Sequence, residues 1–228
     1  MSEQIEILFE DDALIVCVKP AGLVSEVGGG ETRSLPDALT SQLAREGRAV
    51  TLYPVHRLDR EVGGVMVYAK TSACAAHLSR GVSEGTFDKR YMAVLCGVPE
   101  TGQGLLRDLL YHDRQKNKTY VVKRERRGVR EAVLEYRVLG ARGGLSLADI
   151  KLHTGRTHQI RAQFASRKLP LHGDTRYGGV RGERMALWAY RLCFEHPSGK
   201  RAEFLKLPPT AAPFDIFKAE IDIFRNGI

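Results

Sequence analysis

The sequence predicts an α+β fold with a mixed, largely antiparallel β-sheet and flanking helices. Segments of strand character outnumber segments of helical character, and most neighbours are joined by short links. Residues 130–140 and 145–155 alternate apolar and polar side chains, as half-buried antiparallel strands do. With 228 residues, of which 43% are hydrophobic, the chain can bury one substantial core or form two lobes that share one sheet. Because the sequence has no internal repeat and no clear domain boundary, we expect a single domain over residues 1–228.

The chain opens with a buried strand and a capped helix. Residues 13–22, ALIVCVKPAG, are apolar until a proline and a glycine end the strand. Residues 34–47 predict a helix, because Ser34 can cap it, Pro36 suits its first turn and Asp37 stands at the capping-box position. The apolar stripe of this helix consists of Leu35, Leu39 and Leu43.

The remaining strands and helices are predicted from the spacing of their apolar residues. Thr71 can cap a second helix, and a proline and a glycine at residues 197–199 favour the turn of a late hairpin. We expect strands at residues 64–69 and 89–97, helices at 71–84, 156–168 and 212–224, and a hairpin at 185–207.

Composition indicates a protein of the cytoplasm. No apolar run approaches the length that spans a membrane, and the acidic N-terminus lacks the pattern of a signal peptide. The four cysteines lie far apart in apolar surroundings, without a C-x-x-C pair, which favours reduced core residues over disulfides or metal ligands.

The net charge of +8 is concentrated in one segment. Arg114 to Arg130 holds eight Lys or Arg residues against one Glu, which accounts for seven of the eight charges. A lone charged run is usually a solvated hairpin, but this concentration favours a polyanionic partner, and nucleic acid is the obvious one. We expect a hairpin that presents these cations, in particular Lys123, Arg124, Arg126 and Arg127.

A single carboxylate stands among cations before the strand at residues 64–69. Asp59 lies between Arg57 and Arg60 in YPVHRLDREVGG, and the two glycines that end this stretch let another backbone or a ligand approach closely. An Asp between arginines is most often a structural ion pair. An ionised carboxylate in a restricted site can also act as a nucleophile, as a base or as a stabiliser of positive charge on a sugar.

A second cluster, HTGRTHQIRAQF, covers His153 to Phe164. Thr157 can cap the helix that follows, Arg156 stands at the turn, and a helix start favours anions such as phosphate. Arg161 lies within the helix, where it is either an exposed cation or able to reach back to the strand ends. The spacing of His153 and His158 matches no metal-ligand template, so we expect no metal site.

Two shorter segments are further candidates for a functional role. Tyr91 lies near the start of a strand after two cations, where it is either half-buried packing or a platform on which a nucleobase stacks. The glycine-rich stretch at residues 169–179, LPLHGDTRYGG, is interpreted as a structural turn.

Taken together, these motifs resemble the RluA-type pseudouridine synthases over nearly the whole chain. The family signature, H-R-L-D followed by T-S-G, an apolar strand and A-K-T, stands here as residues 56–71. KPAG, KRY, HTGRTHQIR, GDTRYGG and FEHPSGK match further family segments. Val62 and Gly63 replace the usual Thr and Ser, where we expect altered hydrogen bonding without loss of chemistry. The S4-type RNA-binding domain of many relatives is expected to be absent, because KPAG already begins at Lys19.

The resemblance implies an enzyme that isomerises uridine in ribosomal or transfer RNA to pseudouridine. The base leaves C1′ of its ribose, turns and rejoins through C5, so neither a cofactor nor a metal is needed, and the target must be flipped from its helix. Asp59 would be the catalytic carboxylate, which attacks C1′ or takes the 2′ proton. Arg161 would pair with Asp59, and Tyr91 would pack on the base. We expect a monomer that binds RNA and no membrane.

The resemblance also supplies two substrate contacts, which add to those expected from the helix start and the basic segment. Ile160 would line the base pocket, and Arg57 would approach RNA phosphates or fill the space left by the flipped nucleotide. The full substrate-binding set is His56, Arg57, Arg156, Thr157, Ile160 and the four cations of the basic segment.

Two other classes of function stay open. A non-catalytic RNA-binding protein on the same fold would explain the charge, but not the presence of Asp59, Tyr91 and Arg161 together. A nucleosidase or glycoside hydrolase would normally need a second carboxylate, for which Glu61 is the near candidate.

Overall fold

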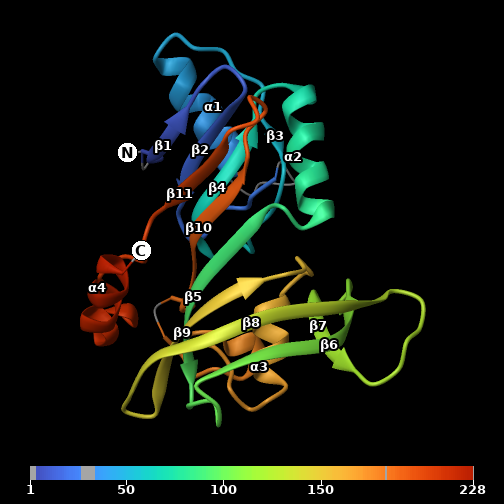
Figure 1. Cartoon of the computed structure of the whole chain (residues 1–228), viewed down its shortest axis with the longest axis vertical. Coiled ribbons are helices and arrows are strands. Elements are labelled where there is room, and N and C mark those ends of the chain that lie inside the picture. The colour runs from blue at the N-terminus through green and yellow to red at the C-terminus, as the bar shows by residue number, and fades with distance from the viewer. Residues whose placement is uncertain (1–3, 27–33, 183, 228) are drawn as a thin grey trace. The chain divides into compact units, whose positions relative to one another are not determined.

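The computed structural model describes residues 4–26, 34–182 and 184–227. The chain divides into two compact units, one formed by Met1–Asp88 with Ala189–Lys206 and the other by Lys89–Trp188 with Leu207–Ile228. The fold is α+β, with mostly antiparallel strand pairs and four α-helices among the described residues (Figure 1), as the sequence predicts. The prediction of one catalytic domain over residues 1–228 stays a prediction.

Strands of the first unit follow the order β1-β2-β4-β10-β11, and β3 pairs with the end of β4. In the antiparallel pair of β2 and β4, Leu14 lies opposite Ala69 and Lys19 opposite Gly64. This register brings Lys19 beside the chain that enters β4. The strands are β1 (Ile7–Glu10), β2 (Leu14–Lys19), β3 (Tyr53–Pro54), β4 (Gly63–Ala69), β10 (Leu187–Glu195) and β11 (Arg201–Leu205).

Two capped helices belong to this unit, α1 (Leu35–Arg45) and α2 (Ser72–Glu84). The predicted caps are confirmed: Ser34 Oγ accepts from the Asp37 N–H at 3.1 Å, and Thr71 Oγ1 accepts from the Cys74 N–H at 3.1 Å. The predicted stripe of three leucines on α1 is fully buried. Helix α2 packs one apolar face onto buried side chains of β2, β4 and β10.

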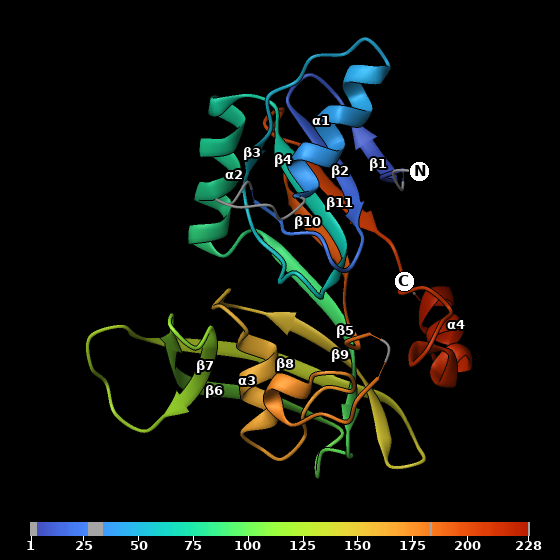
Figure 2. The ribbon, with the colours of Figure 1, turned by 180° about the vertical axis from the view of Figure 1, so that it is seen from behind.

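The second unit is a sheet in the order β5-β9-β8-β6-β7, in which every neighbouring pair is antiparallel. Helix α3 (Gln159–Ala165) lies across β6 and β8 (Figure 2), where Ala162 packs against Leu110 and Ala132. The strands are β5 (Asp88–Cys96), β6 (Gln103–Asp113), β7 (Lys118–Val122), β8 (Val129–Arg142) and β9 (Leu145–Leu152).

Short helices complete the second unit. Two are single 3-10 turns, η1 (Thr175–Tyr177) and η2 (Phe214–Phe217), and η2 runs into α4 (Lys218–Asn226). The predicted helix at residues 212–224 is thus confirmed as a 3-10 turn followed by an α-helix. The predicted hairpin at 185–207 is confirmed as β10 and β11, which turn where the Gly199 N–H donates to the His196 carbonyl.

Two details of the prediction are wrong. Thr157 does not cap α3, because the helix begins two residues later and the capping position is His158, whose φ of 53° is left-handed. The basic segment is also not one hairpin. Its turn and β7 form a hairpin with β6, whereas the run of cations at 123–127 lies in the loop that connects β7 to β8.

Candidate functional site

Asp59 lies in the loop between β3 and β4 of the first unit, and the loop is fixed by hydrogen bonds on both sides of it. Leu58, directly before it, is buried, and its N–H and carbonyl both bind Ser25 Oγ, at 3.0 and 2.7 Å. After it, the Val62 N–H donates to the Asp59 carbonyl at 3.0 Å, which closes a turn. The half-buried Asp59 side chain therefore projects from a backbone that is held in place.

Lys19 is the second support of this loop. Its ammonium group is fully buried and donates to the carbonyls of Pro20, Leu23 and Arg60, at 3.0, 2.7 and 3.0 Å. Burial lowers the pKa of Lys19 to about 8, against the opposing fields of Glu61 and Asp59. The KPAG segment is thereby tied to the residue that follows Asp59 in sequence.

A close backbone approach follows the loop. Gly64 has a φ of 126°, and a Cβ there would lie 2.1 Å from the Ala189 carbonyl oxygen, so only glycine fits. The prediction that these glycines admit another backbone is confirmed at Gly64. Val62, which stands where the family has threonine, is buried and makes its turn through the main chain.

The flanking residues of the loop differ in exposure. Arg57 and Arg60 are exposed, and Arg60 Nε donates to the Gly22 carbonyl at 3.1 Å. His56 is half-buried, accepts from the Val67 N–H at 3.3 Å through Nε2, and lies 5.4 Å from the Phe87 ring. His56 thus contacts the core of its unit, and its predicted contact with substrate stays a prediction.

Arg161 occupies the start of α3 in the second unit and is buried, with 4% of its side chain exposed. Its Nε and Nη2 bind both oxygens of the Asp174 carboxylate, at 2.6 and 2.9 Å, and that carboxylate is 1% exposed. Its guanidinium carbon lies 5.0 Å from the centre of the Tyr177 ring. The interpretation of Arg161 as an exposed cation is therefore wrong.

Sequence reasoning missed Asp174 and Tyr177, because GDTRYGG was interpreted as a structural turn. The stretch does form a turn, in which Gly173 and Gly179 leave no room for a Cβ. The signal for a further role was a lone Asp and a Tyr within a segment that resembles one of the family's. Their contact with Arg161 depends on tertiary structure that no local pattern encodes.

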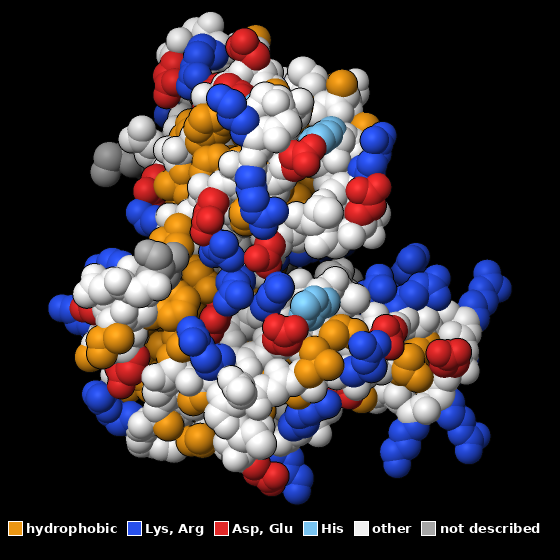
Figure 3. All heavy atoms as spheres, in the orientation of Figure 1, with side chains coloured by type: hydrophobic (Ala, Val, Ile, Leu, Met, Phe, Trp, Pro, Cys, Tyr) orange, Lys and Arg blue, Asp and Glu red, His pale blue; other side chains and the backbone are white. Residues whose placement is uncertain are grey.

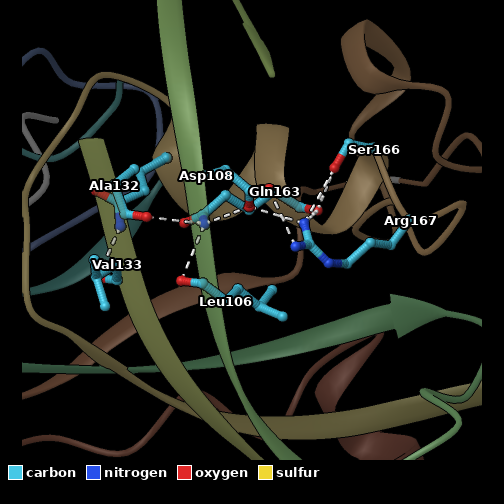
Figure 4. Close-up of polar contacts among 8 residues, drawn as sticks. Leu106, Asp108, Ala132, Val133, Gln163, Ser166 and Arg167 are labelled. Atoms are coloured by element: carbon cyan, nitrogen blue, oxygen red, sulfur yellow. Dashed lines mark hydrogen bonds and ion pairs between the residues drawn. The ribbon is translucent and has the colours of Figure 1, made fainter. Parts of the chain in front are cut away.

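The far end of α3 is anchored by a separate polar network (Figure 4). Gln163 Nε2 donates to Asp108 Oδ2 at 2.7 Å and to the Leu106 and Ala132 carbonyls at 3.3 Å. Arg167 binds both oxygens of Asp108, at 2.9 and 3.1 Å. These contacts fix α3 on the sheet without involving Arg161.

The other predicted contacts of the second unit fall into buried and exposed groups. Tyr91 and Ile160 are 6% and 4% exposed. Arg156 is exposed, its Nε donates to the Glu131 carbonyl at 2.9 Å, and the carbonyl of half-buried Thr157 accepts from Thr119 Oγ1 at 2.8 Å. Asp59 belongs to the other unit, and the predicted pairing of Arg161 with Asp59 stays a prediction.

The basic segment is exposed where the sequence predicts cations. Lys123, Arg124, Arg126 and Arg127 are all exposed, and Figure 3 shows Lys and Arg side chains projecting from the part of the surface around β7 and its loops. Aromatic rings accompany them: the Arg126 guanidinium lies 4.5 Å from the centre of the Tyr111 ring, and Lys118 Nζ lies 5.7 Å from that of Tyr120.

The described ranges were compared with the geometry of metal ligands and of membrane-spanning helices. Among residues 4–26, 34–182 and 184–227, no three His, Cys, Asp or Glu side chains are grouped as metal ligands would be. His153 binds Glu135, and His158 binds Tyr177. Within the same ranges, no helix is both long and apolar enough to cross a bilayer.

Comparison with known proteins identifies the family. Residues 13–166 match the family model described as RNA pseudouridylate synthase. The chain belongs to this family. Its family segment contains the loop of Asp59, β5 with Tyr91 and the whole of α3. The resemblance inferred from HRLD and HTGRTHQIR is thus confirmed.

Relatives within the pseudouridine synthase family come from several bacteria. An uncharacterized RNA pseudouridine synthase of Bacillus subtilis is 33% identical over 199 residues, which cover 85% of this chain and 65% of the relative. The ribosomal large subunit pseudouridine synthase D of Neisseria meningitidis is 35% identical over 216 residues, covering 88% of this chain and 57% of the relative. The chain therefore spans about two thirds, or less, of the length of these proteins.

A solved structure supports the fold. Human RNA pseudouridylate synthase domain containing 4 matches with a TM-score of 0.75 at 23% identity, covering 96% of this chain and 93% of that one. At this level of identity, the match shows that the pseudouridine synthase fold is shared.

Proposed function

We propose that this protein is an RNA pseudouridine synthase that isomerises specific uridines to pseudouridine. Family membership supports the class of reaction. The observation that carries the proposal is the loop of Asp59, in which the Asp59 carboxylate projects from a backbone held by Ser25, Lys19 and the Val62 N–H. A preorganised carboxylate acts at a reacting carbon without first reorganising its surroundings.

In this proposal, Asp59 cleaves the glycosidic bond, either by attack on C1′ or by removal of the 2′ proton. The uracil leaves with the bonding electron pair on N1, stays bound, turns and rejoins C1′ through C5, as the bond to Asp59 breaks or the 2′ proton returns. C5 then loses its proton and N1 gains one, so the isomerisation needs no oxidant and consumes no water. Arg161 pairs with Asp59, Tyr91 packs on the base and Ile160 lines its pocket. The flipped RNA strand is contacted by His56, Arg57, Arg156, Thr157 and the four cations of the basic segment.

Ribosomal RNA is the substrate class that we favour, because several relatives are named as ribosomal large subunit synthases. Transfer RNA is the second candidate. We propose further that the protein is a monomer of the cytoplasm. The four cysteines are free, and three of them are buried, which fits a reducing compartment.

The decisive experiment compares two carboxylates of one loop. Purified wild-type protein, Asp59→Asn and Glu61→Gln are each incubated with total RNA from cells that lack the gene, and pseudouridine is mapped by sequencing. Wild type and Glu61→Gln should form pseudouridine at the same positions, whereas Asp59→Asn should form none while still binding RNA.

Each competing class gives its own result. A non-catalytic RNA-binding protein would leave the RNA unchanged with all three proteins. A nucleosidase would release free uracil, and Glu61→Gln would then be impaired as well. Substantial pseudouridine formation by Asp59→Asn would remove Asp59 from the catalytic role.

A further inference from the structure

The Arg161 guanidinium is held on two sides by residues from the loop at 173–179. Asp174 binds it through a fork of two hydrogen bonds, at 2.6 and 2.9 Å, along the edge formed by Nε and Nη2. The ring of Tyr177 lies 5.0 Å from the guanidinium carbon. The remaining nitrogen, Nη1, lies on the opposite edge of the planar group from this fork.

Tyr177 is itself fixed by two other elements. Its hydroxyl accepts from the Thr119 N–H of β7 at 2.7 Å and lies 3.0 Å from Nδ1 of His158, the residue before α3. His158 has a φ of 53°, a conformation that non-glycine residues keep only where their surroundings impose it. Thr119, which is 2% exposed, also binds the Thr157 carbonyl. Strand β7, the turn before α3 and the ring of Tyr177 therefore form one connected support.

Stability alone gives a poor account of the pair of Arg161 and Asp174. Removing two charges from water costs about as much as their attraction returns, so a buried ion pair is weak evidence for a gain in stability. The other end of α3 already has its own anchor in Asp108, Gln163 and Arg167. What the buried fork adds is orientation, because it fixes the plane of the guanidinium.

We propose that Asp174 and Tyr177 are positioning residues for Arg161. The carboxylate fixes one edge of the guanidinium and the aromatic ring supports its face, so Arg161 presents Nη1 in a set direction. This inference rests on the proposed function, in which Arg161 orients the catalytic carboxylate. It assigns a role to the GDTRYGG segment beyond that of a turn.

The test compares Asp174→Asn with Asp108→Asn. Both substitutions remove the charge of an aspartate that holds an arginine by two hydrogen bonds, and both arginines lie at α3 or directly after it. For each protein we would measure the single-turnover rate at saturating RNA, the Kd for RNA and thermal unfolding.

Asp174→Asn should slow the single-turnover rate by about tenfold to a hundredfold, because misplacing a reacting group by about 1 Å has such an effect. Its Kd for RNA should change by less than about threefold, since Arg161 would act on the reaction and not on the RNA backbone. Asp108→Asn should lower the unfolding temperature but keep the rate within about threefold of wild type. Equal slowing in both variants, or a normal rate in Asp174→Asn, would overturn the proposal.

Tyr177 provides a second route if Asp174→Asn does not fold. Tyr177→Phe keeps the ring beside the guanidinium, whereas Tyr177→Leu removes it. The leucine variant should be slower than the phenylalanine variant by about tenfold at saturating RNA, with a similar Kd. Equal and normal rates in both variants would contradict the inference.

A further measurement separates this inference from the proposed function. If wild-type protein forms no pseudouridine in any RNA, the proposed function fails. The exchange of the Arg161 Nε–H with water, followed by 15N NMR and assigned through Arg161→Lys, still reports on the fork. Exchange that is slow in wild type and Asp108→Asn but fast in Asp174→Asn supports the hold on Arg161, and unchanged exchange in Asp174→Asn refutes it.

Discussion

Replacement of Lys19 by methionine tests whether a buried cation holds the loop of Asp59. The substitution keeps an unbranched side chain of similar length and removes a donor of three hydrogen bonds, to Pro20, Leu23 and Arg60. A hydrogen bond from a charged group contributes about 1.5 to 3 kcal/mol, so three contribute about 4.5 to 9 kcal/mol. The shift of the Lys19 pKa from 10.5 to about 8, in which burial outweighs the fields of Glu61 and Asp59, corresponds to a net cost of about 3 kcal/mol for the charged form.

Subtracting this cost from the contribution of the three hydrogen bonds predicts that Lys19→Met lowers the free energy of unfolding by about 1.5 to 6 kcal/mol. Lys70→Met is the matched control in the same unit, because Lys70 binds Glu10 and the Asp11 carbonyl from a partly exposed position and should lose about 1 kcal/mol. Urea unfolding at neutral pH measures both. A loss for Lys19→Met no larger than that for Lys70→Met would refute the reasoning.

The same lysine predicts a dependence on pH. Its pKa is lower in the folded chain than in the unfolded chain, so between about pH 8 and pH 10.5 the unfolded chain binds more protons. Stability contributed by Lys19 therefore rises with pH through this window. Between pH 7.5 and pH 9.5, wild type should gain about 2 kcal/mol relative to Lys19→Met. A constant difference between the two proteins would show that the pKa of Lys19 is not lowered.

Two further predictions concern the second unit. Tyr91→Phe keeps the ring and loses the hydroxyl, so single-turnover assays on uridine-containing RNA should find normal rates if stacking alone matters, and a block after base detachment if the hydroxyl helps to remove the C5 proton. Reversal of Lys123, Arg124, Arg126 and Arg127 to Glu should weaken RNA binding strongly and lower the slope of log K against log salt by about 3, at about 0.7 for each phosphate contact. Turnover at saturating RNA should fall much less, and an unchanged affinity and salt slope would mean that the loop is merely solvated.

The sequence predicts the local structure well where the signal is local. Ser34 and Thr71 cap their helices as expected. The alternation of apolar and polar side chains correctly predicts the strands β8 and β9. Prediction fails at the start of α3, where Thr157 looks like a cap. The left-handed conformation of His158 depends on Tyr177, nineteen residues away, and on Thr119.

The candidate site shows the same division. HRLD and HTGRTHQIR led to Asp59 and Arg161, since each motif is contiguous in sequence. Lys19 was noticed only as part of KPAG, because its bond to the Arg60 carbonyl spans 41 residues. Asp174 was missed as a partner of Arg161 because the sequence of a turn does not show whether its aspartate is buried or exposed.

The position of β7 has a consequence for solubility. It is the last strand in the order of its sheet, so one side of its backbone is an edge to which the strand of another molecule could add. Lysine and arginine side chains on this strand and in its flanking loops repel such a neighbour, because a second copy carries the same charges. The cations proposed to hold RNA would then also prevent self-association while no RNA is bound. Variants that neutralise them with apolar residues should aggregate, whereas variants that carry glutamate should stay dispersed.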